Sequence, residues 1–247
     1  MNSQSVNMTN SPTSNGNLNM SLNVKIVAVD GPAGSGKSTI CKLAGEKLGW
    51  DYVSTGKLYR AIGILANERG IDLDDDELLV ELTKEFETKF RWNAETDELF
   101  FGERNFGDLL YSVQAGAGAS KVAKQPKFRE ALLPVQRKMA TFSKEGALFD
   151  GRDVGTIVFP DADCKIYMTA SLEKRAQRRL DQLKGKSEIL PSLVELMADI
   201  EQRDRQDSSR GVAPLLQAED AIFFDTSELT LEQSVDKMVE IIKKHTV

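Results

Sequence analysis

The sequence predicts an α/β fold in which helices cover both faces of a parallel β-sheet. Short apolar runs alternate with longer segments that place apolar residues at helical spacing, which is the order typical of such sheets. The first apolar run, residues 26–29, reads IVAV without a polar member, and this indicates a central strand buried on both faces. The sequence contains no internal repeat.

A glycine-rich loop with the pattern G-x-x-x-x-G-K-S follows this strand at residues 31–38. Its glycines can adopt backbone angles that other residues avoid, so successive N–H groups can surround a phosphate at the start of the next helix. Lys37 suits the β- and γ-phosphates of a nucleoside triphosphate, and the Ser38 hydroxyl suits Mg²⁺. The alternative, a structural glycine turn with a solvated lysine, is disfavoured because the loop lies between a strand and a helix. The expected binding residues are Gly31, Pro32, Ala33, Gly34, Ser35, Gly36, Lys37, Ser38 and Thr39.

Composition narrows the possible functions. The chain has 32 Lys and Arg against 38 Asp and Glu, with a net charge of -6, so we expect no nucleic-acid partner, which would need a basic face. No run of about 18 apolar residues occurs, so we expect no membrane span. Cys41 and Cys164 lack any C-x-x-C spacing and indicate free thiols in a cytoplasmic protein. His245 is the only histidine, which excludes a Ser-His triad and a His-ligated metal.

Residues 1–23 predict a disordered tail. They contain no Lys or Arg and are rich in Asn, Ser and Thr, which cannot bury enough apolar surface to offset the entropy of ordering. The positive start and apolar centre of a secretory signal are both missing. Met20 is an alternative translation start, because the globular pattern begins just after it, and an intact mass measurement would distinguish the two starts.

Residues 36–60 continue the α/β order, with a helix expected at 36–48 and a strand at 51–54. The segment STGKLYR at 54–60 has the glycine and hydroxyls of a turn from a strand into another helix. Arg60 lies one turn into that helix, beside the phosphate-binding end of the sheet. A solvated helix arginine is the alternative for Arg60.

Residues 72–106 predict a helix and then a small antiparallel insert. The acidic residues at 72–77 favour a helix N-terminus more than a metal site. From residue 86 to 106 the apolar period falls to two, with aromatic residues in short runs and polar turns at 93–97 and 102. This pattern is typical of short antiparallel strands.

Residues 114–156 lead to a second charged segment. A stretch rich in Gly and Ala at 114–120 precedes a helix that reaches about residue 143, and an apolar strand at 147–149 ends in DGRDVGT. An aspartate at a strand end, here Asp150, suits Mg²⁺ in a P-loop protein. A glycine-punctuated surface loop is the alternative, but ligands bind at the carboxyl ends of strands in open α/β sheets.

The last third predicts a mobile helical lid. Helices are expected at 172–183 and 193–205, joined by a polar break at 184–191, and such a pair can close over a triphosphate. A solvated charged face is the alternative, because acidic residues balance some of the basic ones. A final strand at 221–224 and a C-terminal helix follow, and Thr230 with Gln233 predicts a capping box for that helix.

Together these segments resemble the bacterial cytidylate kinases, members of the nucleoside monophosphate kinase group of P-loop proteins. The resemblance covers about residues 26–244 and depends on DGPAGSGKST, STGKLYRA, ASKVAKQPKFREALL, DGRDVGTIVFPDA, EKRAQRR, RDRQDSSRGVAPL and DTSELT. It implies a P-loop NTPase-type parallel sheet, a small antiparallel β insert and a helical lid. The implied kinase domain is 24–247, with a core at 24–54, 109–170 and 212–247, a monophosphate-binding region at 55–108 and a lid at 171–211.

The resemblance implies transfer of the γ-phosphate of ATP to CMP or dCMP, with Mg²⁺, by a monomer. No protein base is needed, because the attacking phosphate oxygen is already anionic near neutral pH. The implied catalytic residues are Lys37, Arg152, Arg210 and Asp153, and the metal ligands are Ser38 and Asp150. Arg60, Arg152 and Arg210 would bind the acceptor phosphate. The remaining implied contacts are Ser120, Arg129 and Asp153 to cytosine, Arg203 and Asp207 to ribose, Arg175 and Arg179 to ATP, and Thr55 in the acceptor region.

This sequence departs from the family pattern at two positions. It has Ser54 where an aspartate is usual and Lys57 where a small residue is usual. Three other functions are alternatives to this one. The nearest is a related kinase that acts on UMP, AMP, dTMP or shikimate. A GTP-dependent switch is disfavoured because no N-K-x-D segment is present, and a nonenzymatic nucleotide-binding module is disfavoured by Lys37 together with the arginines.

Overall fold

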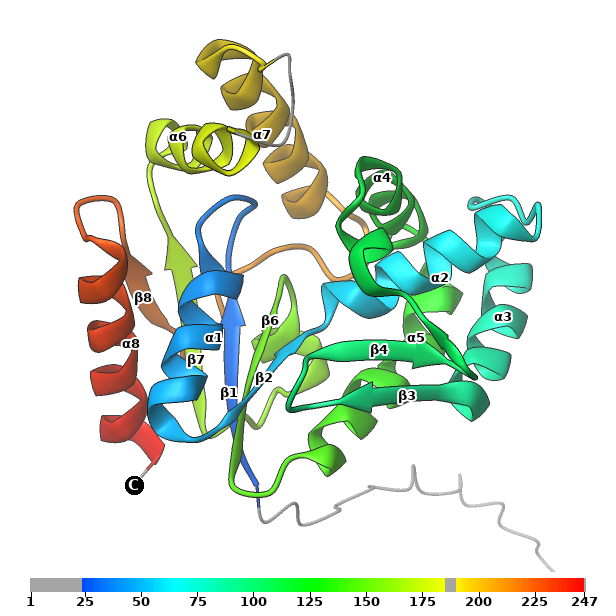
Figure 1. Cartoon of the computed structure of the whole chain (residues 1–247), viewed down its shortest axis with the longest axis horizontal. Coiled ribbons are helices and arrows are strands. Elements are labelled where there is room, and N and C mark those ends of the chain that lie inside the picture. Colours follow the sequence, from blue (N-terminus) through cyan, green and yellow to red (C-terminus); the bar gives the residue numbers. More distant parts are fainter. Residues whose placement is uncertain (1–23, 185–189, 247) are drawn as a thin grey trace, which may run out of the picture.

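A five-stranded parallel sheet forms the centre of the molecule (Figure 1). The computed structural model describes residues 24–184 and 190–246. The strand order is β2-β6-β1-β7-β8, so the strand before the glycine-rich loop is the middle one, as predicted. The strands are β1 (Lys25–Asp30), β2 (Asp51–Ser54), β6 (Gly146–Gly151), β7 (Cys164–Thr169) and β8 (Ile222–Asp225).

Alternate residues of β1 belong to two separate hydrophobic clusters. Ile26 and Ala28 pack into the larger cluster on one face of the sheet, and Val27 and Val29 pack into the cluster on the other face. All four side chains are buried. The expectation that this strand is covered on both faces is confirmed, and it explains why the run contains no polar residue.

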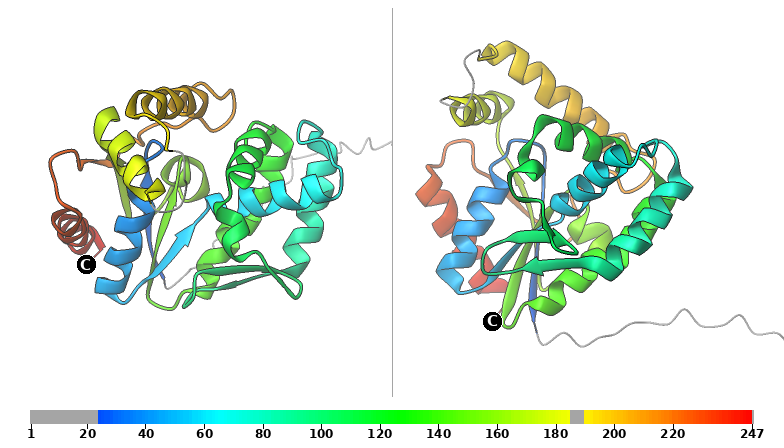
Figure 2. Two further views of the ribbon diagram at one scale, coloured as in Figure 1. Left: turned by 45° about the horizontal axis from the view of Figure 1, so that its top comes forward. Right: turned by 45° about the vertical axis from the view of Figure 1, so that its right-hand side comes forward.

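Helices cover both faces of the sheet and lie above the carboxyl ends of its strands. Figure 1 shows α1 (Lys37–Leu48) and α8 (Leu231–Thr246) side by side on one face. The other face is covered mainly by α2 (Gly56–Glu68) and α5 (Pro126–Lys138), with α3 (Asp76–Lys89) packed beside α5. Two views in Figure 2 show α6 (Leu172–Leu183) and α7 (Leu193–Ser208) together above the carboxyl ends of the strands.

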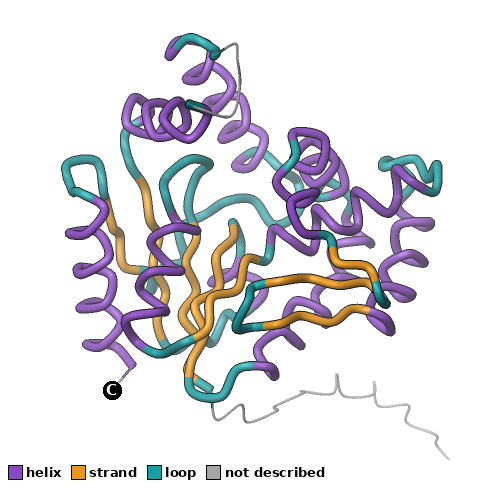
Figure 3. The backbone as a smooth tube through the Cα atoms, viewed as in Figure 1, coloured by secondary structure: helices purple, strands orange, loops and turns teal. Residues whose placement is uncertain are grey.

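The predicted antiparallel insert is present as a separate three-stranded sheet, coloured as strand in Figure 3. It consists of β3 (Phe90–Asn93), β4 (Glu98–Phe101) and β5 (Arg104–Asn105), followed by the 3₁₀-helix η1 (Gly107–Tyr111). The insert begins later than the sequence pattern indicates, because α3 continues to Lys89. Phe86 is still helical, and its ring stacks on Phe90 and Phe101 at 5.7 Å, joining the helix to the insert.

The stretch rich in Gly and Ala is a helix, α4 (Val113–Val122), that the sequence pattern does not predict. Its N-terminus is capped by Ser112, whose hydroxyl accepts from the backbone N–H of Ala115 at 3.1 Å. A Cβ added at Gly63 of α2 would lie only 3.1 Å from the backbone of Gly118. The small residues therefore serve close packing of α4 on α2.

Several local predictions are confirmed. Asp75 caps α3 by accepting from Leu78 N–H at 3.1 Å, and Cys41 and Cys164 are free and buried. Thr230 and Gln233 form the reciprocal capping bonds of α8, at 3.0 and 3.2 Å. Within residues 24–184 and 190–246, no helix is long and apolar enough to cross a membrane. The predicted tail at 1–23, the alternative start at Met20 and residues 185–189 of the polar break lie outside the described residues.

Candidate active site

The glycine-rich loop connects β1 to α1 and requires glycine for two reasons. Gly31, Gly34 and Gly36 have φ angles of 151°, 75° and 94°, a region that residues with a Cβ rarely adopt. A Cβ at Gly31 would also lie 1.9 Å from the carbonyl oxygen of Met168 in β7. Gly31 is therefore needed for packing against the neighbouring strand as well as for the shape of the loop.

Lys37 is buried in the loop that it follows. Its Nζ donates to the carbonyl oxygens of Gly31 at 2.7 Å and Pro32 at 2.9 Å. Burial, together with the positive charge of Arg152, lowers the pKa of Lys37 to about 7. Because a phosphate near Lys37 would reverse this effect, the residue is suited to an anionic ligand.

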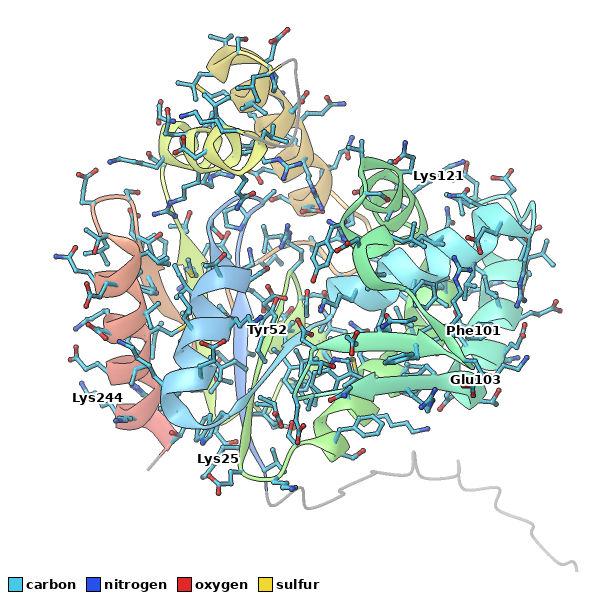
Figure 4. All side chains as sticks on the ribbon, viewed as in Figure 1. Lys25, Tyr52, Phe101, Glu103, Lys121 and Lys244 are labelled. Atoms are coloured by element: carbon cyan, nitrogen blue, oxygen red, sulfur yellow. The ribbon has the colours of Figure 1, made fainter. Side chains whose placement is uncertain are left out.

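The side chains of Ser38 and Asp150 lie in contact beside the loop. Ser38 Oγ donates to Asp150 Oδ2 at 2.6 Å, and Tyr52 donates to the same carboxylate oxygen at 3.2 Å. Figure 4 shows Tyr52 near the middle of the molecule. A hydroxyl and a carboxylate fit Mg²⁺, which binds proteins through few side chains and takes phosphate and water oxygens besides. Among the described residues, no cluster of three His, Cys, Asp or Glu side chains offers another metal site.

Asp30 joins the glycine-rich loop to the segment that carries Arg152 and Asp153. The buried Asp30 carboxylate accepts from the backbone N–H of Val154 at 2.9 Å and of Gly155 at 2.7 Å. Burial raises its pKa to about 6 against these hydrogen bonds. Sequence reasoning missed this residue, although an aspartate at the end of an apolar strand was a visible signal.

The charges of three arginines act on the carboxylate of Asp207, near the end of α7. Arg152 Nε donates to Asp207 Oδ2 at 2.8 Å, and Arg210 Nε donates to the Asp207 carbonyl at 3.2 Å. Burial opposes ionisation of Asp207, but the charges of Arg152, Arg210 and Arg203 outweigh it and keep its pKa below the ordinary value. Burial, together with repulsion from Arg152, lowers the pKa of Arg203 to about 10. The charge of this one carboxylate is thus outnumbered by three nearby guanidinium groups, which favours a further anion.

Arg60 approaches this group from α2. Its Nη1 donates to the carbonyl oxygen of Leu110 at 2.6 Å. Burial lowers the pKa of Arg60, and the nearby charges of Arg179 and Arg152 also lower it, against an opposite effect of Tyr111. Arg60 and Arg152, which lie far apart in the sequence, are therefore close enough to repel one another.

Arg129 and Asp153 form a buried ion pair next to the arginine group. Arg129 Nη2 lies 2.5 Å from Asp153 Oδ2, and the two side chains are 6% and 7% exposed. The Arg129 guanidinium also lies over the ring of Tyr59, 5.3 Å from its centroid. Ser120 lies half-buried on α4, and within the described part of the chain no hydrogen bond joins it to this pair.

The predicted lid arginines differ in their contacts. Arg175 donates to the carbonyl of Ala33 at 3.0 Å and lies 2.5 Å from Asp204 Oδ2, so its guanidinium fixes the glycine-rich loop to α6 and α7. Arg178, which was not singled out, donates to the carbonyl of Ser35 at 2.7 Å. Arg179 is exposed, with a 3.5 Å contact to Gln182. Sequence alone could not distinguish these three arginines.

Thr55 is also engaged with the central sheet. Its Oγ1 and its N–H donate to the carbonyl of Asp150 at 2.9 and 3.1 Å. Thr55 therefore anchors the start of α2 to β6, and its hydroxyl proton is directed at the backbone.

Two surface hollows lie away from the predicted site. One is lined by Leu43 and Leu231 and the other by Arg91 and Phe142. Neither hollow includes a residue of the predicted site.

The fold and the glycine-rich loop define a P-loop phosphotransferase. A family model for cytidylate kinase matches residues 27–244. Cytidylate kinases of Azotobacter vinelandii and of an Exiguobacterium species are each 41% identical, over 90% and 88% of this chain and 97% of their own chains. The chain belongs to the cytidylate kinase family. A solved shikimate kinase of Bacteroides thetaiotaomicron is 18% identical with a TM-score of 0.42, covering 89% of this chain and 98% of its own, a likeness too distant to bear on the substrate.

Proposed function

We propose that this enzyme transfers the γ-phosphate of ATP to CMP or dCMP and releases ADP with CDP or dCDP. Membership of the cytidylate kinase family supports the reaction. The glycine-rich loop and Lys37 bind the phosphates of ATP, and Arg60, Arg152 and Arg210 bind the phosphate of the acceptor. Arg129 and Asp153 bind cytosine, together with Ser120 of α4. Arg203 and Asp207 bind the ribose.

One observation supports this assignment most strongly. Arg152 and Asp153 are adjacent, yet Arg152 joins the arginine group around Asp207 and Asp153 pairs with the buried Arg129. A single segment therefore connects a site for a phosphate to a site with a donor and an acceptor. Cytosine offers an amino donor to the carboxylate, and its ring N3 and O2 accept from arginine.

The two substrates meet at the carboxyl edge of the sheet. Asp30 binds the backbone of Val154 and Gly155, and Ser38 binds Asp150, so the loop that binds ATP abuts the segment that binds the acceptor. The fixed guanidinium groups orient the acceptor phosphate, whose own anionic oxygen attacks. Lys37 and the arginines offset the charge of the transferring group. Mg²⁺, held by Ser38 and Asp150, would supply further charge neutralisation when bound.

The region 171–211 is proposed to act as a lid. Arg175 and Arg178 hold α6 to the backbone of the glycine-rich loop. The end of α7 contacts the acceptor site through Asp207, which binds Arg152 and Arg210. Closure of this pair of helices excludes water that would otherwise hydrolyse ATP. Arg179 is exposed, and its charge lies close enough to Arg60 to lower the pKa of that residue. It is the lid residue best suited to reach the ATP phosphates.

The experiment is an ADP-release assay with ATP, Mg²⁺ and a panel of CMP, dCMP, UMP, AMP, dTMP and shikimate. We expect CMP and dCMP to support turnover far above the others, and we expect Lys37→Met to abolish it. Preferential use of AMP, dTMP or shikimate would contradict the cytosine assignment. ADP release that is independent of any acceptor would contradict the kinase assignment.

A further inference from the structure

Lys57 is a buried lysine outside the glycine-rich loop. It lies in the first turn of α2, and its side chain is only 6% exposed. Its Nζ lies 2.5 Å from Asp97 Oδ2 and donates to the Asp97 carbonyl oxygen at 2.6 Å. A buried ammonium group needs such partners, because an unpaired charge in the interior is strongly unfavourable.

Asp97 belongs to the turn between β3 and β4 of the insert. Its φ angle is 54°, a left-handed conformation that costs free energy for a residue with a Cβ. Trp92 Nε1 of β3 also approaches Asp97 Oδ1, at 3.5 Å. Lys57 therefore holds the tip of the insert against the start of α2 by two contacts to one residue.

Arg60 lies three residues after Lys57, on the same face of α2. Its Nη1 donates to the carbonyl oxygen of Leu110 in η1, the short helix that follows the insert. The Lys57 ammonium lies 5.8 Å from the ring centroid of Tyr111, the residue after Leu110. The two side chains thus fasten the same face of α2 to the insert turn and to η1.

From these contacts we infer that Lys57 is a positioning residue for the acceptor site. The Lys57–Asp97 pair fixes the insert and η1 against α2, and the Leu110 carbonyl of η1 then fixes the Arg60 guanidinium toward the acceptor phosphate. This inference rests on the proposed function, since Arg60 is placed in the acceptor site there. The role concerns the acceptor alone, because neither Lys57 nor Asp97 contacts the glycine-rich loop among the described residues.

The chain offers a matched control. Arg104 of β5 forms a bidentate ion pair with Glu68, the last residue of α2, with Nη2 2.7 Å from Oε1. This pair joins the same insert to the same helix, at the end far from Arg60. Its side chains are 35% and 47% exposed, so breaking it removes a tether without leaving a buried charge.

The test measures KM for CMP, KM for ATP and Tm for the wild type, Lys57→Met, Lys57→Arg and Glu68→Gln. Lys57→Met should raise KM for CMP about tenfold, since a slightly misplaced binding group costs less than the roughly 100-fold loss of a 1 Å error. KM for ATP should stay within about twofold, because the groups that bind ATP are not displaced when Lys57 is changed. Lys57→Arg should retain a KM for CMP near that of the wild type, and Glu68→Gln should leave it unchanged.

Different failures have different meanings. An unchanged KM for CMP in Lys57→Met, a parallel rise of both KM values, or an equal effect of Glu68→Gln would overturn the positioning role. If Lys57→Met does not fold, Asp97→Asn replaces it, with the same expected rise in KM for CMP and the same contrary results. A wild type that uses ATP but not CMP would instead refute the proposed function.

Discussion

The Arg152 Nε lies 2.8 Å from the carboxylate of Asp207, a residue 55 positions later in the chain. This contact joins the segment after β6 to the last turn of α7, and Arg210 lies against the same carboxylate at 3.8 Å. The proposed acceptor site therefore contains residues from the segment after β6 and from the proposed lid. Binding of an acceptor phosphate and closure of α7 should be coupled, because the same arginines take part in both.

Asp207→Asn should lower kcat/KM for CMP by about 10- to 100-fold. The substitution removes the carboxylate that Arg152 and Arg210 both contact, so the two guanidinium groups are no longer held together. Asp199→Asn, at an exposed position of the same helix, is the control and should change little. Steady-state kinetics of both variants measures this, and equal activities would disprove the coupling.

Asp153→Asn should reduce the use of CMP far more than the binding of ATP. The loss in kcat/KM should be about 100-fold or greater, because a site built for a hydrogen-bonded group discriminates strongly when one partner is changed. The free energy of unfolding should also fall by about 1–3 kcal/mol, since Arg129 loses a charged partner. Calorimetric titration with ATP provides the comparison, and equal losses for CMP and ATP would contradict a role in reading cytosine.

Asp150→Asn should raise the Mg²⁺ concentration that gives half-maximal activity. A neutral amide binds Mg²⁺ more weakly than a carboxylate, so we expect a shift of about tenfold or more. Tyr52→Phe removes a donor to the same carboxylate without removing a ligand, and should shift the Mg²⁺ dependence much less. Removal of divalent ions with EDTA should abolish turnover of the wild type. A Mg²⁺ dependence unchanged by Asp150→Asn would rule out this ligand.

Binding of ATP at pH 8 should take up close to one proton. Lys37 has a pKa of about 7 in the free protein, so at pH 8 about nine-tenths of the molecules carry neutral Lys37. Triphosphate oxygens around the ammonium favour its charged form and raise this pKa, so binding protonates it. Calorimetry in buffers of different ionisation enthalpy counts the protons. Lys37→Arg, charged throughout, should take up none, and proton release by the wild type would contradict the prediction.

Local patterns predicted most of the fold. The buried strands, the glycine-rich loop and the capping box of α8 each depend on a few neighbouring residues, and the structure has them where the sequence indicates. Helix α4 was not predicted because its glycines lower helix propensity. Its stability comes from packing on α2, where Gly63 and Gly118 nearly touch. Such a contact between distant segments has no local signature.

The candidate site divides in the same way between local patterns and long-range contacts. Residues in unusual local patterns, such as Lys37 and Arg152, are candidates that the sequence alone suggests. Asp30 was missed because its partners, the N–H groups of Val154 and Gly155, are 124 and 125 residues away. Arg175 and Arg178 lie on one helix with similar neighbours, so only the fold reveals that both contact the glycine-rich loop.

The most direct test is a crystal structure with CMP and a non-hydrolysable ATP analogue bound together with Mg²⁺. The distance between a CMP phosphate oxygen and the γ-phosphorus is the decisive quantity. We predict about 3–3.5 Å, the separation of groups poised to react, with Arg60, Arg152 and Arg210 all bonded to the CMP phosphate. A CMP phosphate bound away from these arginines, or beyond reach of the γ-phosphate with the lid closed, would contradict the account.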